Sequence, residues 1–168
     1  MKLRTFGVVL CLLVAASAFA KGNANLQPIA GNWTCTGIAF ASDMGPEHPT
    51  KATVASTWIL SDQWLQVRYT EMKTPKNPHP IAVELLMGYN EAQKKVVSGC
   101  VDNMGGYCTE DSPGWEGDKM VLNGNNTFGA NSMKVRDTFT KGPGWVKHLG
   151  EMEGPKGWMK LSEETCKH

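Results

Sequence analysis

Short segments of alternating hydrophobic and polar residues follow one another along most of the chain. In the clearest of them, every second residue from Ile81 to Tyr89 is hydrophobic or aromatic, and Glu84 lies on the opposite face. A period of two is typical of a β-strand with one buried face, and no segment repeats with the helical period. Glycine, proline and asparagine residues separate the segments. The pattern therefore predicts an all-β protein.

These segments predict about ten strands, which is enough to close a barrel. A strand that carries Trp33 opens the series. Further strands are expected at 53–60, 64–72, 81–89, 94–101, 106–110, 119–122, 133–140, 145–152 and 158–166. Because the connections are short, the predicted fold is a single antiparallel up-and-down barrel of the lipocalin-like (calycin) type. The proline-containing segments 41–50 and 75–80 are expected to be loops.

Residues 1–20 have the three parts of a signal peptide. Lys2 and Arg4 form a positive start, residues 6–16 a short hydrophobic core, and AFA at 18–20 a small-residue cleavage site. We therefore predict cleavage before Lys21 and a periplasmic or secreted protein with one lipocalin-like barrel domain over residues 21–168. The hydrophobic run is too short to span a bilayer comfortably, and no later run competes with it, so no membrane span is expected.

The charge of the chain gives no sign of a polyanionic partner. There are 17 Lys and Arg residues and 16 Asp and Glu residues, and the predicted leader contains two of the basic ones. The remaining chain is close to neutral and has no run of like charge. This pattern favours neither nucleic acid nor an anionic membrane as a partner.

Four cysteines follow the predicted cleavage site, and an even number in an oxidising compartment favours disulfides. Four cysteines allow three pairings. If a three-residue hairpin loop ends at Gly105 in the left-handed conformation, Cys100 and Cys108 lie opposite each other at a distance that a disulfide spans. Cys35 and Cys166 then remain in the first and last strands, which closure of a barrel brings together. No CxxC or His-x-His spacing supports the alternative of a metal site.

Five short blocks in the middle of the chain form a recognisable series. They are GYN at 88–90, KKVVS at 94–98, DNMG at 102–105, GDK at 117–119 and KVRD at 134–137. In this order they resemble a family of exported bacterial proteins known as domain of unknown function 1579, and the resemblance covers residues 33–161. It implies a lipocalin-like barrel and no settled activity. Cys100 departs from the family, whose members tend to carry an aromatic residue there, and the additional cysteines suggest a barrel reinforced by disulfides.

His148 is a candidate for contact with a ligand. It shares a strand face with Val146, so it points either into the barrel or outwards. The segment from Gly31 to Cys35 resembles the opening Gly-x-Trp-x-Gly motif of ten-stranded haem barrels, which raises the possibility of an axial haem ligand. Cys35 replaces the third motif residue, however, and we favour a hydrogen-bonded or solvated strand histidine.

Arg136 is a candidate for binding a carboxylate, because a guanidinium group offers two parallel donors in one plane. Its strand places it with Lys134 and Thr138 on a polar face, opposite Val135. That face is outside in an ordinary sheet, but a barrel that contains water has a partly polar interior, so both orientations stay open. Asp137 lies on the hydrophobic face, where a carboxylate needs a partner.

Aromatic residues on strands are candidate walls of a cavity, although most of them are expected to pack in the core. We expect Trp33 to plug the closed end of the barrel. The candidate ligand-binding residues are Trp58, Tyr69, Tyr89, Arg136 and His148.

Catalytic motifs are sparse in this sequence. It has no Gly-x-Ser-x-Gly elbow and no phosphate-binding glycine loop between a strand and a helix. Asp102 is expected to shape a turn rather than to act as a general base. We therefore predict no catalytic residue, no metal site and no cofactor.

Three classes of function remain. The leading hypothesis is an exported barrel that binds a small apolar or amphipathic molecule. The second is an isomerase or hydrolase on the same scaffold, which requires at least two of Asp102, His148 and Arg136 to come within hydrogen-bond distance. The third is a structural or interaction protein whose barrel is filled by its own side chains.

Overall fold

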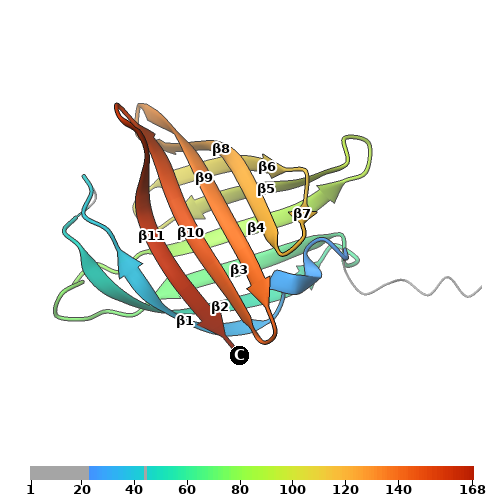
Figure 1. Cartoon of the computed structure of the whole chain (residues 1–168), viewed down its shortest axis with the longest axis horizontal. Helices are drawn as coiled ribbons and strands as arrows, with labels where there is room; N and C mark the ends of the chain where they lie inside the picture. Colours follow the sequence, from blue (N-terminus) through green and yellow to red (C-terminus); the bar gives the residue numbers. More distant parts are fainter. Residues whose placement is uncertain (1–22, 44) are drawn as a thin grey trace, which may run out of the picture.

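The computed structural model of the chain describes residues 23–43 and 45–168, and the predicted signal peptide lies outside them (Figure 1). The described part consists of strands and one short 3-10 helix. The elements are η1 (Gln27–Ile29), β1 (Asn32–Ala39), β2 (His48–Ile59), β3 (Trp64–Glu71), β4 (Ala82–Asn90), β5 (Lys95–Asp102), β6 (Gly106–Ser112), β7 (Trp115–Glu116), β8 (Lys119–Phe128), β9 (Asn131–Gly142), β10 (Trp145–Gly154) and β11 (Gly157–Lys167).

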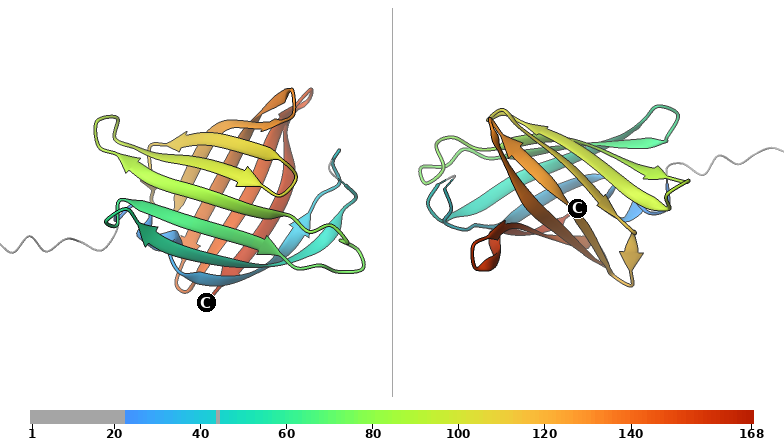
Figure 2. Two further views of the ribbon diagram at one scale, coloured as in Figure 1. Left: turned by 180° about the vertical axis from the view of Figure 1, so that it is seen from behind. Right: turned by 90° about the horizontal axis from the view of Figure 1, so that it is seen from above.

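The strands form one closed antiparallel barrel. The long strands pair with their neighbours in sequence, and β1 pairs with β11. The two-residue strand β7 follows β6 in the chain, but β6 pairs directly with β8. Figure 2 shows from two further directions how the strands wrap around one axis. Since β7 pairs only with β8, ten strands make the ring. The predicted all-β, up-and-down barrel of about ten strands is confirmed.

Two strands extend at one end by five or more residues beyond the predicted bounds. The predicted loop 41–50 contains the start of β2, because His48 and Pro49 pair with the end of β1. Pairing of β2 with β3 begins only at Ala52, so Pro49 needs no hydrogen bond on that side. The strand predicted to end at Leu122 continues to Phe128, since its asparagine-rich second half pairs with both β6 and β9. In both places pairing with neighbouring strands outweighs local propensity.

The hydrophobic core fills one end of the barrel, where η1 also lies (Figure 1). Trp33 is 8% exposed, and its indole Nε1 donates a hydrogen bond to the carbonyl oxygen of Ile29 (3.2 Å). The indole Nε1 of Trp115 donates to the carbonyl oxygen of Asn25 (2.7 Å). These two bonds attach the segment before β1 to the barrel and close this end. The fully or almost fully buried residues around them include Leu26, Leu65, Met87, Val96, Met120 and Leu122.

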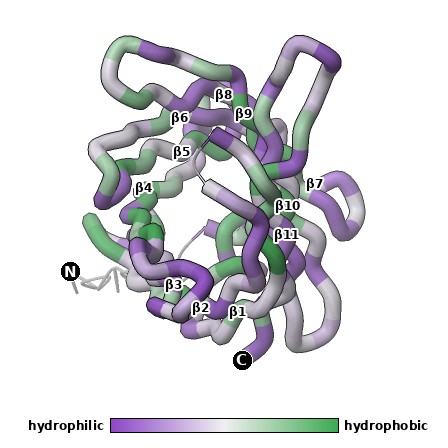
Figure 3. The backbone as a smooth tube through the Cα atoms, turned by 90° about the vertical axis from the view of Figure 1, so that its left-hand side faces the viewer, coloured by the Kyte–Doolittle hydropathy of each residue, from purple (hydrophilic) through white to green (hydrophobic). Residues whose placement is uncertain are grey.

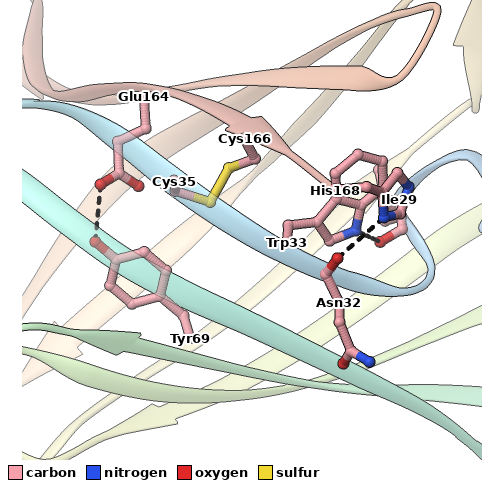
Figure 4. The surroundings of a disulfide bond; sticks show 8 residues. All are labelled: Ile29, Asn32, Trp33, Cys35, Tyr69, Glu164, Cys166 and His168. Carbon is pink, nitrogen blue, oxygen red and sulfur yellow. Dashed lines mark hydrogen bonds between the residues drawn. A yellow bond between two sulfur atoms is a disulfide. The ribbon is translucent and has the colours of Figure 1, made fainter.

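Two disulfides join strands that are neighbours in the barrel. Cys35 of β1 is bonded to Cys166 of β11, the last strand of the barrel (Figure 4), and Cys100 of β5 is bonded to Cys108 of β6. Gly105 has the left-handed φ of 85° that the predicted hairpin loop requires. The two bonds suggest an oxidising, extracytoplasmic location. Within residues 23–43 and 45–168, no helix has the length and apolar character needed to cross a membrane.

Glycine is required at position 124 by the packing of β8 against β6. A Cβ atom there would lie 1.9 Å from the carbonyl oxygen of Thr109 and 2.7 Å from the Cα atom of Glu110. Since backbone atoms cannot move away cheaply, we expect Gly124→Ala to lower the free energy of unfolding by about 3 kcal/mol. Equilibrium unfolding in urea measures the difference.

Gly99→Ala is the matched control on β5. The nearest atom to an added Cβ at this position is 3.8 Å away, which is an ordinary contact. We expect the control to change the free energy of unfolding by less than about 1 kcal/mol. Equal losses in the two variants would contradict the close approach of β8 to β6.

Candidate functional site

A cavity of about 380 Å³ lies inside the barrel. Its volume is within the range of ligand pockets, about 300 to 1,000 Å³. Ile29 and Trp33 line it at the closed end, and His79, Ile81 and Met104 line it at the end formed by the longer loops. Figure 3 looks along the barrel and shows the strands arranged around this interior. The cavity is the candidate functional site.

Strand alternation determines which side chains reach the cavity. On β4, Val83, Leu85 and Met87 line it, whereas Glu84 and Leu86 point outwards. The walls are mainly apolar. Polar side chains interrupt them on β2, β3, β5, β6, β8, β9, β10 and β11 and in the loops.

Glu110, Asp137 and His148 form a chain of side chains inside the barrel. The imidazole Nε2 of His148 lies 2.7 Å from Oδ1 of Asp137. Because an ionised carboxylate only accepts hydrogen bonds, Nε2 is the donor. The carboxyl group of Glu110, from β6, hydrogen-bonds the carboxyl group of Asp137. Asp137 and His148 keep 27% and 26% of their side-chain surface because they face the cavity.

Burial and neighbouring charges separate the pKa values of these three groups. Burial, reinforced by the negative charge of Asp137, raises the pKa of Glu110 to about 9. Burial opposes ionisation of Asp137, but the hydrogen bond and charge of His148 outweigh it and lower the pKa of Asp137. Burial also opposes protonation of His148, yet Asp137 raises the pKa of the imidazole. At neutral pH these shifts favour a protonated Glu110 beside an Asp137–His148 ion pair.

Tyr69 and Glu164 form a second polar contact inside the barrel. The Tyr69 hydroxyl on β3 donates a hydrogen bond to Oε1 of Glu164 on β11 (3.0 Å), passing over β1 and β2 as Figure 4 shows. Glu164 is 4% exposed. Burial, followed by the charges of Glu164 and Glu71, raises the pKa of Tyr69 well above its usual range, so the phenol stays protonated.

Glu71 and His48 form a third contact, near the loops. Glu71 is buried, and its Oε2 accepts a hydrogen bond from the backbone N–H of Ile81 (3.2 Å). Its Oε1 lies 3.3 Å from Nε2 of His48. This contact connects the end of β3 to the start of β2 and to the segment before β4.

Three of the carboxyl groups that line the cavity each face a glycine on a neighbouring strand. A Cβ atom at Gly37 or Gly124 would lie 2.8 Å from the Cγ atom of the glutamate opposite. The absence of a side chain at these positions leaves the room that the carboxyl groups occupy. The pairs in register are Glu164 with Gly37, Glu110 with Gly124 and Asp137 with Gly150.

The five candidate ligand-binding residues fall into three groups. Tyr69 and His148 line the cavity. Trp58 and Tyr89 are partly buried and pack against the core. Arg136 lies on the outer face of β9, where its Nε donates to Oε2 of Glu151 (2.9 Å) and its guanidinium group stacks on the Trp158 ring at 4.4 Å.

The polar face of β9 is therefore the outer one, and Arg136 does not line the cavity. Among the described residues, no hydrogen bond or ion pair joins any two of Asp102, Arg136 and His148, the groups named in the enzyme hypothesis. Oδ1 of Asp102 accepts hydrogen bonds from the backbone N–H groups of Met104 and Gly106, both at 2.8 Å, and so shapes the hairpin turn. His148 pairs with Asp137 and with neither of the other two candidates.

Some buried polar atoms that line the cavity have no hydrogen-bond partner among the described residues. They include the hydroxyl oxygens of Thr50 and Ser98, each on a residue 7% exposed, and Oδ1 of Asn126. Oε1 of Glu110 has no N–H or O–H donor within this part of the chain either. Buried polar groups are normally satisfied, so these atoms mark the positions where a bound molecule gains most from hydrogen bonding.

Sequence reasoning missed Glu110 and Glu164, although the alternation contained the signal. Glu110 is two residues from Cys108 and Glu164 two residues from Cys166, so each shares a strand face with a cysteine. All four disulfide cysteines line the cavity. Because residues two apart on a strand point to the same side, disulfides that lie inside the barrel place both glutamates inside it as well.

Comparison with known proteins gives a family and a fold. Residues 20–140 match the model of the family described as Protein of unknown function (DUF1579). The crystal structure of Rv2717c from M. tuberculosis is similar, with a TM-score of 0.67 and 10% identity over 88% of this chain and 98% of that one. At this identity the likeness shows the fold alone. No curated protein matches the sequence.

Proposed function

We propose that this chain, which belongs to the DUF1579 family of proteins of unknown function, binds a small apolar or amphipathic molecule inside its barrel. The observation that carries the proposal is the cavity of about 380 Å³ with mainly apolar walls that are interrupted by polar groups. Such a combination is typical of small-molecule sites. A structural barrel filled by its own side chains would leave no such space.

We further propose that the protein acts after export, in the periplasm or outside the cell. The predicted signal peptide at residues 1–20 and the two disulfides support this location. A soluble exported binder would carry an apolar compound through an aqueous compartment, because the barrel removes the apolar surface of the compound from water.

Native mass spectrometry of the protein purified from an oxidising compartment tests the proposal. We expect a noncovalent adduct that disappears on denaturation and whose mass identifies the ligand. After extraction of that ligand, the neutral fluorophore N-phenyl-1-naphthylamine is expected to bind saturably with increased emission. A bare polypeptide that also fails to bind the fluorophore would contradict the proposal.

Val83→Trp fills the cavity and is expected to weaken binding of the fluorophore at least about tenfold, since it removes the space for an apolar group. Val101→Trp is the matched control on the adjacent strand, because Val101 is 57% exposed and points outwards. We expect the control to bind like the unmodified protein in a fluorescence titration. Equal loss in both variants would place the fluorophore outside the barrel.

A further inference from the structure

The charged groups around the cavity are strongly biased towards acids. Among the described residues that line it, three are histidines and none is lysine or arginine. Two of the histidines already contact carboxyl groups, His48 with Glu71 and His148 with Asp137. The acidic lining residues are Glu71, Asp102, Glu110, Asp137, Glu164 and Glu151, and only the last of these has its carboxylate paired with an arginine, Arg136 on the outer face. The lining therefore offers no strong cation to an anionic ligand.

The least satisfied part of this lining is the carboxyl pair of Glu110 and Asp137. Glu110 is 7% exposed, and no N–H or O–H group of the described chain reaches its Oε1. Ser98 is its register partner on β5, is equally buried, and has an unpartnered hydroxyl oxygen. Two carboxyl groups and a free hydroxyl oxygen thus face the cavity at one place, with an excess of acceptors over donors.

We propose that the cavity selects ligands whose polar end is a protonated amine, and that the ammonium group binds at the Glu110–Asp137 pair beside Ser98. This inference rests on the proposed function and specifies the class of ligand. An ammonium group has three donors and no acceptor, so it complements these oxygens. A carboxylate ligand would instead bring a third acidic group into a buried site without a free cation, which is strongly unfavourable.

Binding of the amine is coupled to the loss of one proton. In the free protein Glu110 keeps a proton because it is buried beside Asp137. An ammonium group favours the ionised form, so its N–H groups donate to the Glu110 carboxylate while the Glu110 proton leaves to solvent. The facing groups on the other elements are Ser98 on β5 and Gly124 on β8, which carry no charge, and Asp137 on β9 with its partner His148 on β10. Affinity for the amine is therefore expected to rise as the pH increases towards about 9.

Displacement of N-phenyl-1-naphthylamine by decylamine, decanol and decanoate tests the selectivity at about pH 8. The three probes share a ten-carbon chain and differ in the polar end. We expect decylamine to bind at least about tenfold more tightly than decanol, because its ammonium group gains a charge-assisted hydrogen bond. We expect decanoate to bind at least about tenfold more weakly than decanol, because its charge would be buried without a partner. Titration calorimetry in two buffers of different ionisation enthalpy is expected to show release of about one proton with decylamine and none with decanol.

Glu110→Gln keeps the shape of the protonated side chain but cannot ionise. We expect it to reduce decylamine affinity about tenfold and abolish proton release, while decanol affinity stays within about twofold. Glu116→Gln, an exposed residue on β7, is the control and is expected to behave like the unmodified protein. Equal affinity for decylamine and decanol, preference for decanoate, or decylamine binding without proton release would overturn the amine proposal and leave the binding barrel intact. Failure of all three probes to displace a bound fluorophore would also overturn the amine proposal alone, whereas failure of the fluorophore itself to bind would count against the proposed function.

Discussion

The double variant Cys35→Ala/Cys166→Ala is expected to lose about 5 kcal/mol of unfolding free energy. The disulfide joins Cys35 of β1 to Cys166 of β11, and these two residues are 131 positions apart in the sequence. Its removal releases almost the whole barrel from one closed loop, and the entropy that the unfolded chain gains depends on the length of that loop. Since the total stability of a domain is about 5 to 15 kcal/mol, we expect a variant that is barely folded at ambient temperature.

The double variant Cys100→Ala/Cys108→Ala is the matched control. This bond spans only 8 positions within one hairpin, and the same model gives a loss of about 2.5 kcal/mol. Urea unfolding followed by tryptophan fluorescence compares the two variants with the unmodified protein. If both variants lose the same free energy, loop length is not what makes the bond between β1 and β11 stabilising.

The second large effect is a loss of stability as the pH rises from about 5 to about 8. The pKa of Glu110 rises from 4.5 to about 9 on folding, so over this interval the folded protein holds a proton that the unfolded chain has released. Stability therefore decreases with increasing pH, by at most about 1.4 kcal/mol per pH unit and about 4 kcal/mol over the interval. Urea unfolding at a series of pH values measures the slope.

The variant Glu110→Gln separates the contribution of Glu110 to the pH dependence of stability from the contribution of His148. The raised pKa of His148 also makes stability decrease as the pH rises past its ordinary value, because the folded protein keeps the imidazolium longer. The variant removes only the glutamate contribution, so we expect a shallower slope and a more stable protein at about pH 8. Glu116→Gln is expected to keep the original slope. A slope unchanged by Glu110→Gln would show that Glu110 is already ionised in the folded protein.

The alternation of hydrophobic and polar residues predicted which side chains of an individual strand face the interior. The face defined by Ile81, Val83 and Leu85 lines the cavity as the period of two predicts, because side chains on a strand point alternately to its two sides. The hairpin that ends at Gly105 brings Cys100 and Cys108 together through local geometry alone. Such features depend on residues that are close in sequence, and a sequence contains them directly.

The candidate site depends on contacts that no local pattern contains. Asp137 and His148 lie on strands whose register is determined by a hairpin, so their contact was within reach of sequence reasoning once the inner face was known. Glu110 joins them from β6 only because β6 and β8 close the barrel beside β9. Tyr69 meets Glu164 across two intervening strands, and that distance is set by the curvature of the whole barrel.

The orientation of β9 also depends partly on the local sequence and partly on the tertiary structure. Arg136 and Asp137 are adjacent, so one of them faces the interior, and composition favoured Asp137 because Val135 shares its face. An inward Arg136, which the sequence left open beside the outward orientation, would have required a barrel with a partly polar interior. The charged groups among the mainly apolar walls are carboxyl groups and histidines, and Arg136 instead pairs with Glu151 on the outer side.

The sequence alone determined the all-β class, the approximate strand count, the hairpin disulfide and the near balance of acidic and basic residues, because period, turn residues and composition are local properties. The closed barrel decided which acids share one cavity, how protons are distributed between Glu110, Asp137 and His148, and that no lysine or arginine of the described residues lines that cavity. Burial and mutual proximity set those properties, and both arise only when strands far apart in sequence are brought around a common axis.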